Sequence, residues 1–144
     1  MSIPEHTKTI IYITSRGRLL VFRHTEFPEA GIQVPAGSVE TGEDPACTAM
    51  REAEEETGLT GLSMSSCLGT DQVQVSINGQ TVNLQRYFYH LIAPDLVPER
   101  WIHYENDPSD GSPSPIEFEF YWVSLAGEVP YLAGDQDAFL HLVG

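Results

Sequence analysis

Basic residues are scarce in this chain. Lys and Arg number 7 among its 144 residues, against 21 Asp and Glu, so the formal net charge is −14. The field of such a surface repels nucleic acid and anionic membranes, and we expect neither as a partner. A phosphorylated substrate would therefore need metal ions to bridge it to the protein.

Cysteines and long hydrophobic runs are scarce as well. Cys47 and Cys67 are the only cysteines and have no CxxC spacing, which indicates neither a disulfide framework nor a thiolate zinc site. The apolar stretch 9–13 is interrupted at Ser15, too soon for a signal peptide or a membrane span. We therefore expect a cytoplasmic protein, and the length predicts a single domain over residues 1–144.

Common catalytic motifs are missing too. Neither GxGxxG nor GxxxxGK[ST] occurs, so phosphate binding by a glycine-rich loop is unsupported, and no GxSxG indicates a serine hydrolase. The histidines are His6, His24, His90, His103 and His141. They show neither HxxxH nor HExxH spacing, and we assign them no chemistry.

Alternating and β-branched residues predict strands on both sides of one helical segment. The predicted strands are 7–14, 18–23, 72–77, 80–93, 101–104 and 116–123. The Asn78-Gly79 pair predicts a hairpin, because both residues tolerate positive φ. These strands, together with the two helices described next, predict an α/β fold with a mixed sheet covered by helices.

The central helix is predicted over 45–57. Asp44 can cap its first turn, proline suits the first helical position, and Gly58 provides a left-handed stop. A second, terminal helix is expected over 136–143, beginning on Asp135. The apolar face of the central helix consists of Ala46, Ala49, Met50 and Ala53.

Three glutamates converge on a neighbouring face of this helix. Glu52, Glu55 and Glu56 are related by three and four positions, so their carboxylates lie within about one turn and repel one another. A divalent cation would remove that repulsion, and Mg²⁺ prefers such oxygen ligands. An ordinary solvated acidic face is the alternative.

The spacing of the surrounding residues favours the metal site. Gly37 is followed after five residues by Glu43, and after seven more by the run from Arg51 to Leu59. This pattern resembles the Nudix box, G-x5-E-x7-R-E-U-x-E-E-x-G-U with U apolar, at each fixed position. Average residue usage predicts such a match by chance less than about once in 10⁸ start positions.

The resemblance implies an α/β/α sandwich with a mixed, largely antiparallel sheet and bound Mg²⁺, for which Mn²⁺ can substitute. It implies Glu52, Glu55 and Glu56 as metal ligands, with a carbonyl near Gly37 as a further candidate. Glu43 and Arg51 resemble the family's structural ion pair. Arg51 would also orient the carboxylates, and Gly37 and Gly58 would provide backbone geometry.

The resemblance also implies a function: Mg²⁺-dependent hydrolysis of a phosphoric anhydride in a small nucleoside diphosphate derivative. Water would attack phosphorus, with Glu52 or Glu55 as the first choice of proton acceptor. Candidates outside the box are Glu105, Glu117 and Glu119. The rival hypothesis is a nucleotide-sensing or scaffold module on the same fold without turnover.

Groups that position the substrate are sought outside the box. The candidates are Arg23, Arg86, Tyr87, Tyr89 and Trp101, because arginine can fork onto phosphate and aromatic rings can stack on a base. Each could equally be a surface charge or a core aromatic. A homodimer through a strand edge or the 116–122 stretch is open, and a calcium site at Asp107, Asp110 and Glu117 is a weak alternative.

Overall fold

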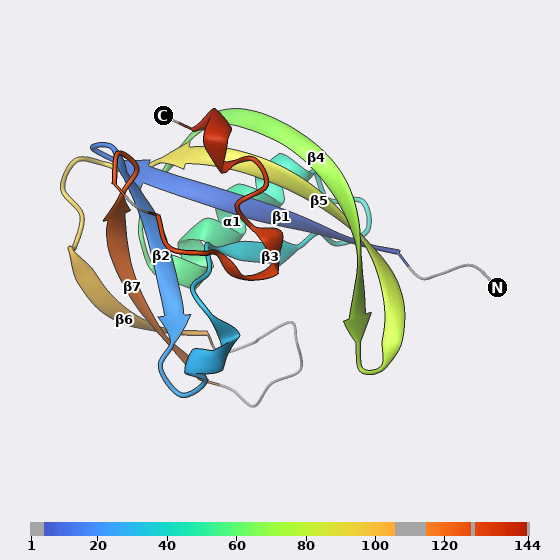
Figure 1. The fold of residues 1–144 in the computed structure, drawn as a ribbon. Coiled ribbons are helices and arrows are strands. Elements are labelled where there is room, and N and C mark those ends of the chain that lie inside the picture. Colours follow the sequence, from blue (N-terminus) through green and yellow to red (C-terminus); the bar gives the residue numbers. More distant parts are fainter. Residues whose placement is uncertain (1–4, 106–114, 128, 144) are drawn as a thin grey trace.

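The computed structural model describes residues 5–105, 115–127 and 129–143, so Asp107 and Asp110 lie outside the described residues. The strands are β1 (Glu5–Ser15), β2 (Arg18–His24), β3 (Ala36–Ser38), β4 (Ser63–Ile77), β5 (Gln80–Ile92), β6 (Arg100–Glu105) and β7 (Ile116–Ser124). The helical elements are α1 (Pro45–Thr57) and the 3-10 turns η1 (Pro28–Ala30), η2 (Ala133–Asp135) and η3 (Leu140–Leu142). Figure 1 shows their arrangement.

The strands form one mixed sheet in the order β4-β5-β1-β2-β7-β6, with β3 added to β1. β1 and β5 run parallel, and the other strand pairs are antiparallel. β1 and β2 pair only next to their turn, at Thr14 with Leu19 and Ser15 with Arg18. They diverge from there, as Figure 1 shows, and β3 pairs with β1 where β2 has left it. The predicted mixed, largely antiparallel sheet is confirmed.

Alternate residues of β1 supply the two cores. Ile11 and Ile13 pack on the face that α1 covers, and Ile10 and Tyr12 pack on the opposite face, which the C-terminal segment covers. All four side chains are at most 3% exposed. The central strand is therefore buried on both faces, between α1 and the C-terminal segment.

α1 has the predicted bounds and the predicted ends. The Asp44 carboxylate accepts a hydrogen bond from the Ala46 N–H at 2.8 Å, and Gly58 ends the helix in the left-handed conformation with φ 77°. Ala49 and Ala53 are completely buried, and their small side chains bring the helix close to the sheet. No helix in the described part of the chain is long and apolar enough to cross a membrane.

The expected terminal α-helix over 136–143 is wrong, because this described segment contains one short 3-10 turn, η3, and no α-helix. Backbone and side-chain groups of residues 136–139 instead form hydrogen bonds with distant parts of the chain. The Tyr12 hydroxyl donates to the Gln136 carbonyl and accepts from the Phe139 N–H. The Gln136 side chain accepts from the Val34 N–H at 2.8 Å. These contacts fix the segment on the sheet without a regular helix.

Candidate functional site

A cavity of about 1010 Å³ lies between α1, the loop that precedes it and β6. Its acidic lining residues are Glu40, Glu43, Glu52, Glu55, Glu56 and Glu105, and Arg51 is the only Lys or Arg among the described residues that line it. The remaining lining includes Ala36, Ser38, Thr41, Gly42, His103 and Tyr104. The structure thus brings the three box glutamates together with one glutamate from β6.

Arg51 connects three of these carboxylates. Its guanidinium lies 3.0 Å from Glu43, 3.1 Å from Glu52 and 3.4 Å from Glu55. The contact with Glu43 is bidentate, since both guanidinium NH2 and Nε donate to that carboxylate. Arg51 therefore holds the loop before α1 against the helix and orients two glutamates of the cavity.

Gly37 makes room for Glu52. A Cβ atom at position 37 would lie 2.2 Å from the Glu52 Cγ, so the glutamate side chain lies directly against the glycine backbone. The Gly37 carbonyl accepts a hydrogen bond from the Thr9 hydroxyl at 3.4 Å. Burial raises the pKa of Glu52, and the Arg51 charge opposes that rise.

Glu56 is the most deeply buried acid of the cavity, with 7% of its surface exposed. Burial raises its pKa well above the usual range, and the nearby Glu105 raises it further. The Ala36 N–H donates to its carboxylate at 3.4 Å, a long contact that offsets little of the desolvation. A cation next to Glu56 would supply the missing compensation.

The donor set suits a hard divalent cation. It contains carboxylate oxygens and no thiolate, which is the ligand chemistry of Mg²⁺ and Mn²⁺. In the described conformation, no three Asp, Glu, His or Cys side chains of the described residues converge enough to hold an ion. Arg51 binds Glu52 and Glu55, so these two side chains would have to turn toward Glu56 to share a cation.

β6 binds the C-terminal turn of α1 through two ring nitrogens. Trp101 Nε1 donates to the Thr57 carbonyl at 2.8 Å, and His103 Nε2 lies 2.8 Å from the Glu55 carbonyl. The His103 ring leaves no room for a side chain at Gly58, where a Cβ would approach it to 3.0 Å. These contacts satisfy carbonyls at the end of the helix and fix its position beside the cavity.

Sequence reasoning missed His103 and Tyr104, which both line the cavity. The alternation along β6 was the available signal, because Trp101, His103 and Glu105 share the strand face that contacts α1. The contact between β6 and α1 joins segments about 45 residues apart and has no local signature. Among the three outside candidates, Glu105 lines the cavity.

The other two candidates outside the box, Glu117 and Glu119, belong to β7 and do not line the cavity. Glu119 lies 2.6 Å from Arg23 and 3.2 Å from Arg100. Glu117 accepts hydrogen bonds from the Thr25 and Tyr104 hydroxyls, at 2.6 Å and 3.0 Å. These partners lower the pKa values of both carboxylates, so both are held ionised away from the lining of the cavity.

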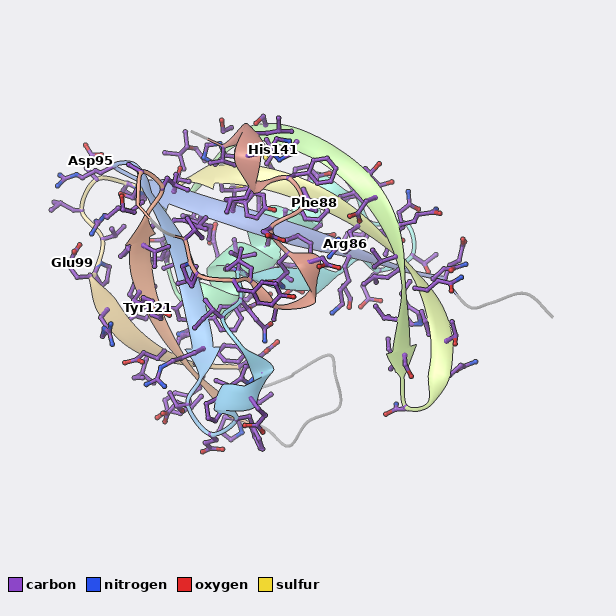
Figure 2. The ribbon with its side chains drawn as sticks, viewed as in Figure 1. Arg86, Phe88, Asp95, Glu99, Tyr121 and His141 are labelled. Atoms are coloured by element: carbon purple, nitrogen blue, oxygen red, sulfur yellow. The ribbon has the colours of Figure 1, made fainter. Side chains whose placement is uncertain are left out.

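The structure does not bring the predicted substrate-positioning residues into the cavity. Arg23 pairs with Glu119, Trp101 stacks on Phe120, and Tyr87 and Tyr89 pack in the core beneath α1. Arg86 lies beside the C-terminal segment on the other face of the sheet, as Figure 2 shows. None of the five is among the residues that line the cavity.

The fold and the cavity define a protein with a mixed sheet and an acidic helix suited to a divalent cation. The family profile described as "NUDIX domain" matches residues 4–141. The chain belongs to the Nudix family. The crystal structure of a MutT NUDIX hydrolase from Burkholderia pseudomallei shows the same fold: it is 21% identical, with a TM-score of 0.58, and the match covers 97% of this chain and 98% of that one.

Two curated relatives match over shorter stretches. An ADP-ribose pyrophosphatase of Bacillus subtilis (strain 168) is 34% identical over 58 residues, which are 39% of this chain and 31% of the relative. An RNA pyrophosphohydrolase of Rhodospirillum rubrum is 47% identical over 49 residues, which are 34% of this chain and 29% of the relative. The chain thus spans about three tenths of the length of these relatives.

Proposed function

We propose that this protein hydrolyses a phosphoric anhydride bond in a small nucleoside diphosphate derivative and requires Mg²⁺ or Mn²⁺. The observation that carries the proposal is the gathering of Glu52, Glu55, Glu56 and Glu105 around one cavity. Two relatives whose names end in pyrophosphatase or pyrophosphohydrolase support the class of bond. The free, exposed thiols of Cys47 and Cys67 accord with a cytoplasmic location.

Glu52, Glu55 and Glu56 would hold the cation, which when bound neutralises phosphate oxygens and activates water. The chain itself adds little positive charge, since Arg51 is the only Lys or Arg among the described lining residues. A diphosphate would therefore bind poorly to the metal-free cavity. Arg51 orients the carboxylates through its contacts with Glu52 and Glu55.

A carboxylate must accept the proton of the water that attacks phosphorus. Glu52 and Glu55 lie on α1 and are the first candidates, and Glu105 reaches the same cavity from β6. Replacing each of the three with glutamine separates the roles. The proton acceptor is the residue whose loss lowers kcat while the binding of Mn²⁺ remains, because a ligand would lose both.

Two residues of β6 are the best placed to contact the rest of the substrate. His103 and Tyr104 line the cavity next to the acidic cluster, and both rings can stack on a nucleobase. Arg23, Arg86 and Trp101 do not line the cavity, so we propose His103 and Tyr104 ahead of them. The acidic lining favours a small nucleotide over an RNA end, whose backbone charge the cavity would repel.

The test is hydrolysis of a panel of nucleoside triphosphates, dinucleotides, nucleotide sugars and coenzymes with Mg²⁺ or Mn²⁺, with products identified by mass. We expect release of a phosphorylated product from at least one member, and loss of that activity with EDTA. Glu54→Gln is the matched control, since Glu54 lies on the same helix but outside the cavity. Binding of a nucleotide without turnover would favour the sensing module.

A further inference from the structure

The two edges of the sheet differ in length and in charge. β6 has six residues, and both of its ends, Arg100 and Glu105, are charged. β4 has fifteen residues and one charged side chain, Asp71, which Arg86 binds at 2.8 Å and 2.7 Å. Edge strands are normally short or charged, because their open backbone groups otherwise pair with other chains. β4 is neither short nor rich in charged side chains, so it lacks both of these protections against pairing with another chain.

The absence of charge extends beyond the strand itself. Asp71 is the only charged residue between Glu56 and Arg86, whereas charged residues make up 19% of the whole chain. Because Arg86 compensates Asp71, this part of an otherwise strongly acidic protein is electrically neutral. Two copies of a chain with a net charge of −14 can therefore approach each other here with the least repulsion.

The neutral edge is regular only in its second half. The pairing of β4 with β5 is irregular between Met64 and Ser66 and between Cys67 and Gly69, and such bulges hinder further pairing. From Gly69 to Ile77 every residue pairs in register with β5. Within the described residues, no backbone hydrogen bond connects this stretch to any element except β5. Figure 1 shows β4 on the outside of the sheet.

The same stretch has an apolar face outside both cores. Val73, Val75 and Ile77 alternate along β4, with Leu84 and Val82 opposite the first two on β5. None of these five belongs to either of the core clusters among the described residues. Val82 is buried, Val73 and Val75 are half-buried, and Ile77 is 43% exposed. The other face of β4 is polar without charge, with Thr70, Gln72, Gln74 and Ser76.

We propose that Gly69–Ile77 of β4 is a homodimer interface, in which two copies pair antiparallel and join their sheets. A two-fold axis at Val73, the middle of the regular stretch, makes the pairing self-complementary. It places Gln72 opposite Gln74 and Asp71 opposite Val75 of the second copy, so no like charges face each other. The apolar faces that β4 and β5 form in each of the two copies then make one continuous strip.

The interface leaves the carboxylate cavity open. The cavity is lined from α1 and β6, and β6 is the opposite edge of the sheet from β4. Dimer formation and hydrolysis are therefore separable, and a variant that changes one is not required to change the other. The inference stands on β4 alone and does not depend on the proposed function.

Sedimentation of the full chain over a range of concentrations tests the interface. We expect wild type to associate to twice the 16.0 kDa chain mass. Gln72→Lys with Gln74→Lys places four ammonium groups around the axis and should raise the dissociation constant at least about 100-fold, since facing like charges cost several kcal/mol. The matched control is Gln80→Lys with Thr81→Lys, which adds the same charge to exposed positions of β5. Circular dichroism checks the fold of each variant.

Cross-linking tests the register. In a chain with Cys47→Ser and Cys67→Ser, Val73→Cys should form an intermolecular disulfide at the axis, because a disulfide needs Cα atoms within about 7 Å. Position 75 faces Asp71 of the second copy, so Val75→Cys should form far less of the intermolecular disulfide. The proposal is overturned if wild type stays monomeric at all concentrations, if the lysine pair and its control behave alike, or if both cysteine variants cross-link equally.

Discussion

Arg51 and Arg86 each bind carboxylates, but the balance of charge around them is opposite. Arg86 is nearly inaccessible, with 3% of its side chain exposed, and pairs with the single carboxylate of Asp71. Its remaining donors reach the carbonyls of Gly134 and Asp135. Charge and hydrogen bonds are satisfied there within the chain, so this pair fixes the C-terminal segment on the sheet.

Arg51 lies in a surplus of negative charge. It contacts three glutamates, and three more, Glu40, Glu56 and Glu105, line the same cavity. Arg51 is the only Lys or Arg among the described residues that line the cavity with these six carboxylates. Burial raises the pKa of Glu56, and the Lys8 charge opposes that rise only in part. A fold selected for stability alone would not retain such a group. We infer that the unbalanced cluster is the functional one, and variants of Glu56, Arg86 and Arg51 test this difference between the two arginines.

The largest effect is expected from Glu56→Gln. Loss of this carboxylate should lower hydrolysis by more than about 100-fold, because even the groups that only orient metal ligands are worth 10–100-fold. The unfolding free energy of the metal-free protein should stay the same or rise, because an uncompensated buried charge is removed. Steady-state kinetics and urea unfolding in EDTA measure the two quantities. Equal activity in Glu56→Gln and Glu54→Gln would contradict the assignment of Glu56 as a metal ligand.

Arg86→Met should have the opposite effects: it should lower the unfolding free energy and leave activity unchanged. Removing one partner of a buried pair leaves Asp71 without its counter-charge and should cost about 3 kcal/mol of unfolding free energy. Activity per folded molecule should be unchanged, since Arg86 does not line the cavity. Urea unfolding monitors stability, and active-site titration gives the folded fraction.

A double variant controls for this loss. Asp71→Leu combined with Arg86→Met replaces the pair by apolar groups and should recover most of the stability, as observed for other buried ion pairs. A strong loss of turnover by folded Arg86→Met would contradict the purely structural role.

Arg51→Lys should have the smallest effect. An ammonium group retains the charge but not the planar fork, so the contacts with Glu43, Glu52 and Glu55 cannot all persist. Activity should fall by about tenfold, as for other orienting residues. The unfolding free energy should change by less than about 1 kcal/mol, because Arg51 is substantially exposed. A larger change in stability than in kcat would assign Arg51 to the fold instead.

The sequence predicted most of what is local in the site. The bounds of α1, its Asp44 cap and the placement of Glu52, Glu55 and Glu56 beside one cavity follow from helical spacing and end preferences, which depend on neighbours in the chain. Gly37 was predicted to serve backbone geometry, but it is not among the glycines with positive φ, and the structure gives another reason for it: a Cβ there would collide with the Glu52 side chain.

Features that depend on distant pairing could not be predicted. Arg86 was expected near substrate, yet the register of β4 with β5 places it opposite Asp71 on the far face of the sheet. His103 reaches the cavity only because β6 packs on the end of α1. The terminal helix was expected from a start signal at Asp135, but the hydroxyl of Tyr12, more than 120 residues away, bonds the backbone of this segment.

Binding of Mn²⁺ shows whether the carboxylates of the cavity hold a cation. Electron paramagnetic resonance of protein stripped with EDTA counts bound Mn²⁺ in wild type, Glu56→Gln and Glu54→Gln, without a substrate. We expect wild type and Glu54→Gln to bind Mn²⁺ alike and Glu56→Gln to bind it far more weakly. Equal binding by all three proteins would contradict the view that the buried carboxylate of the cavity is there for a cation.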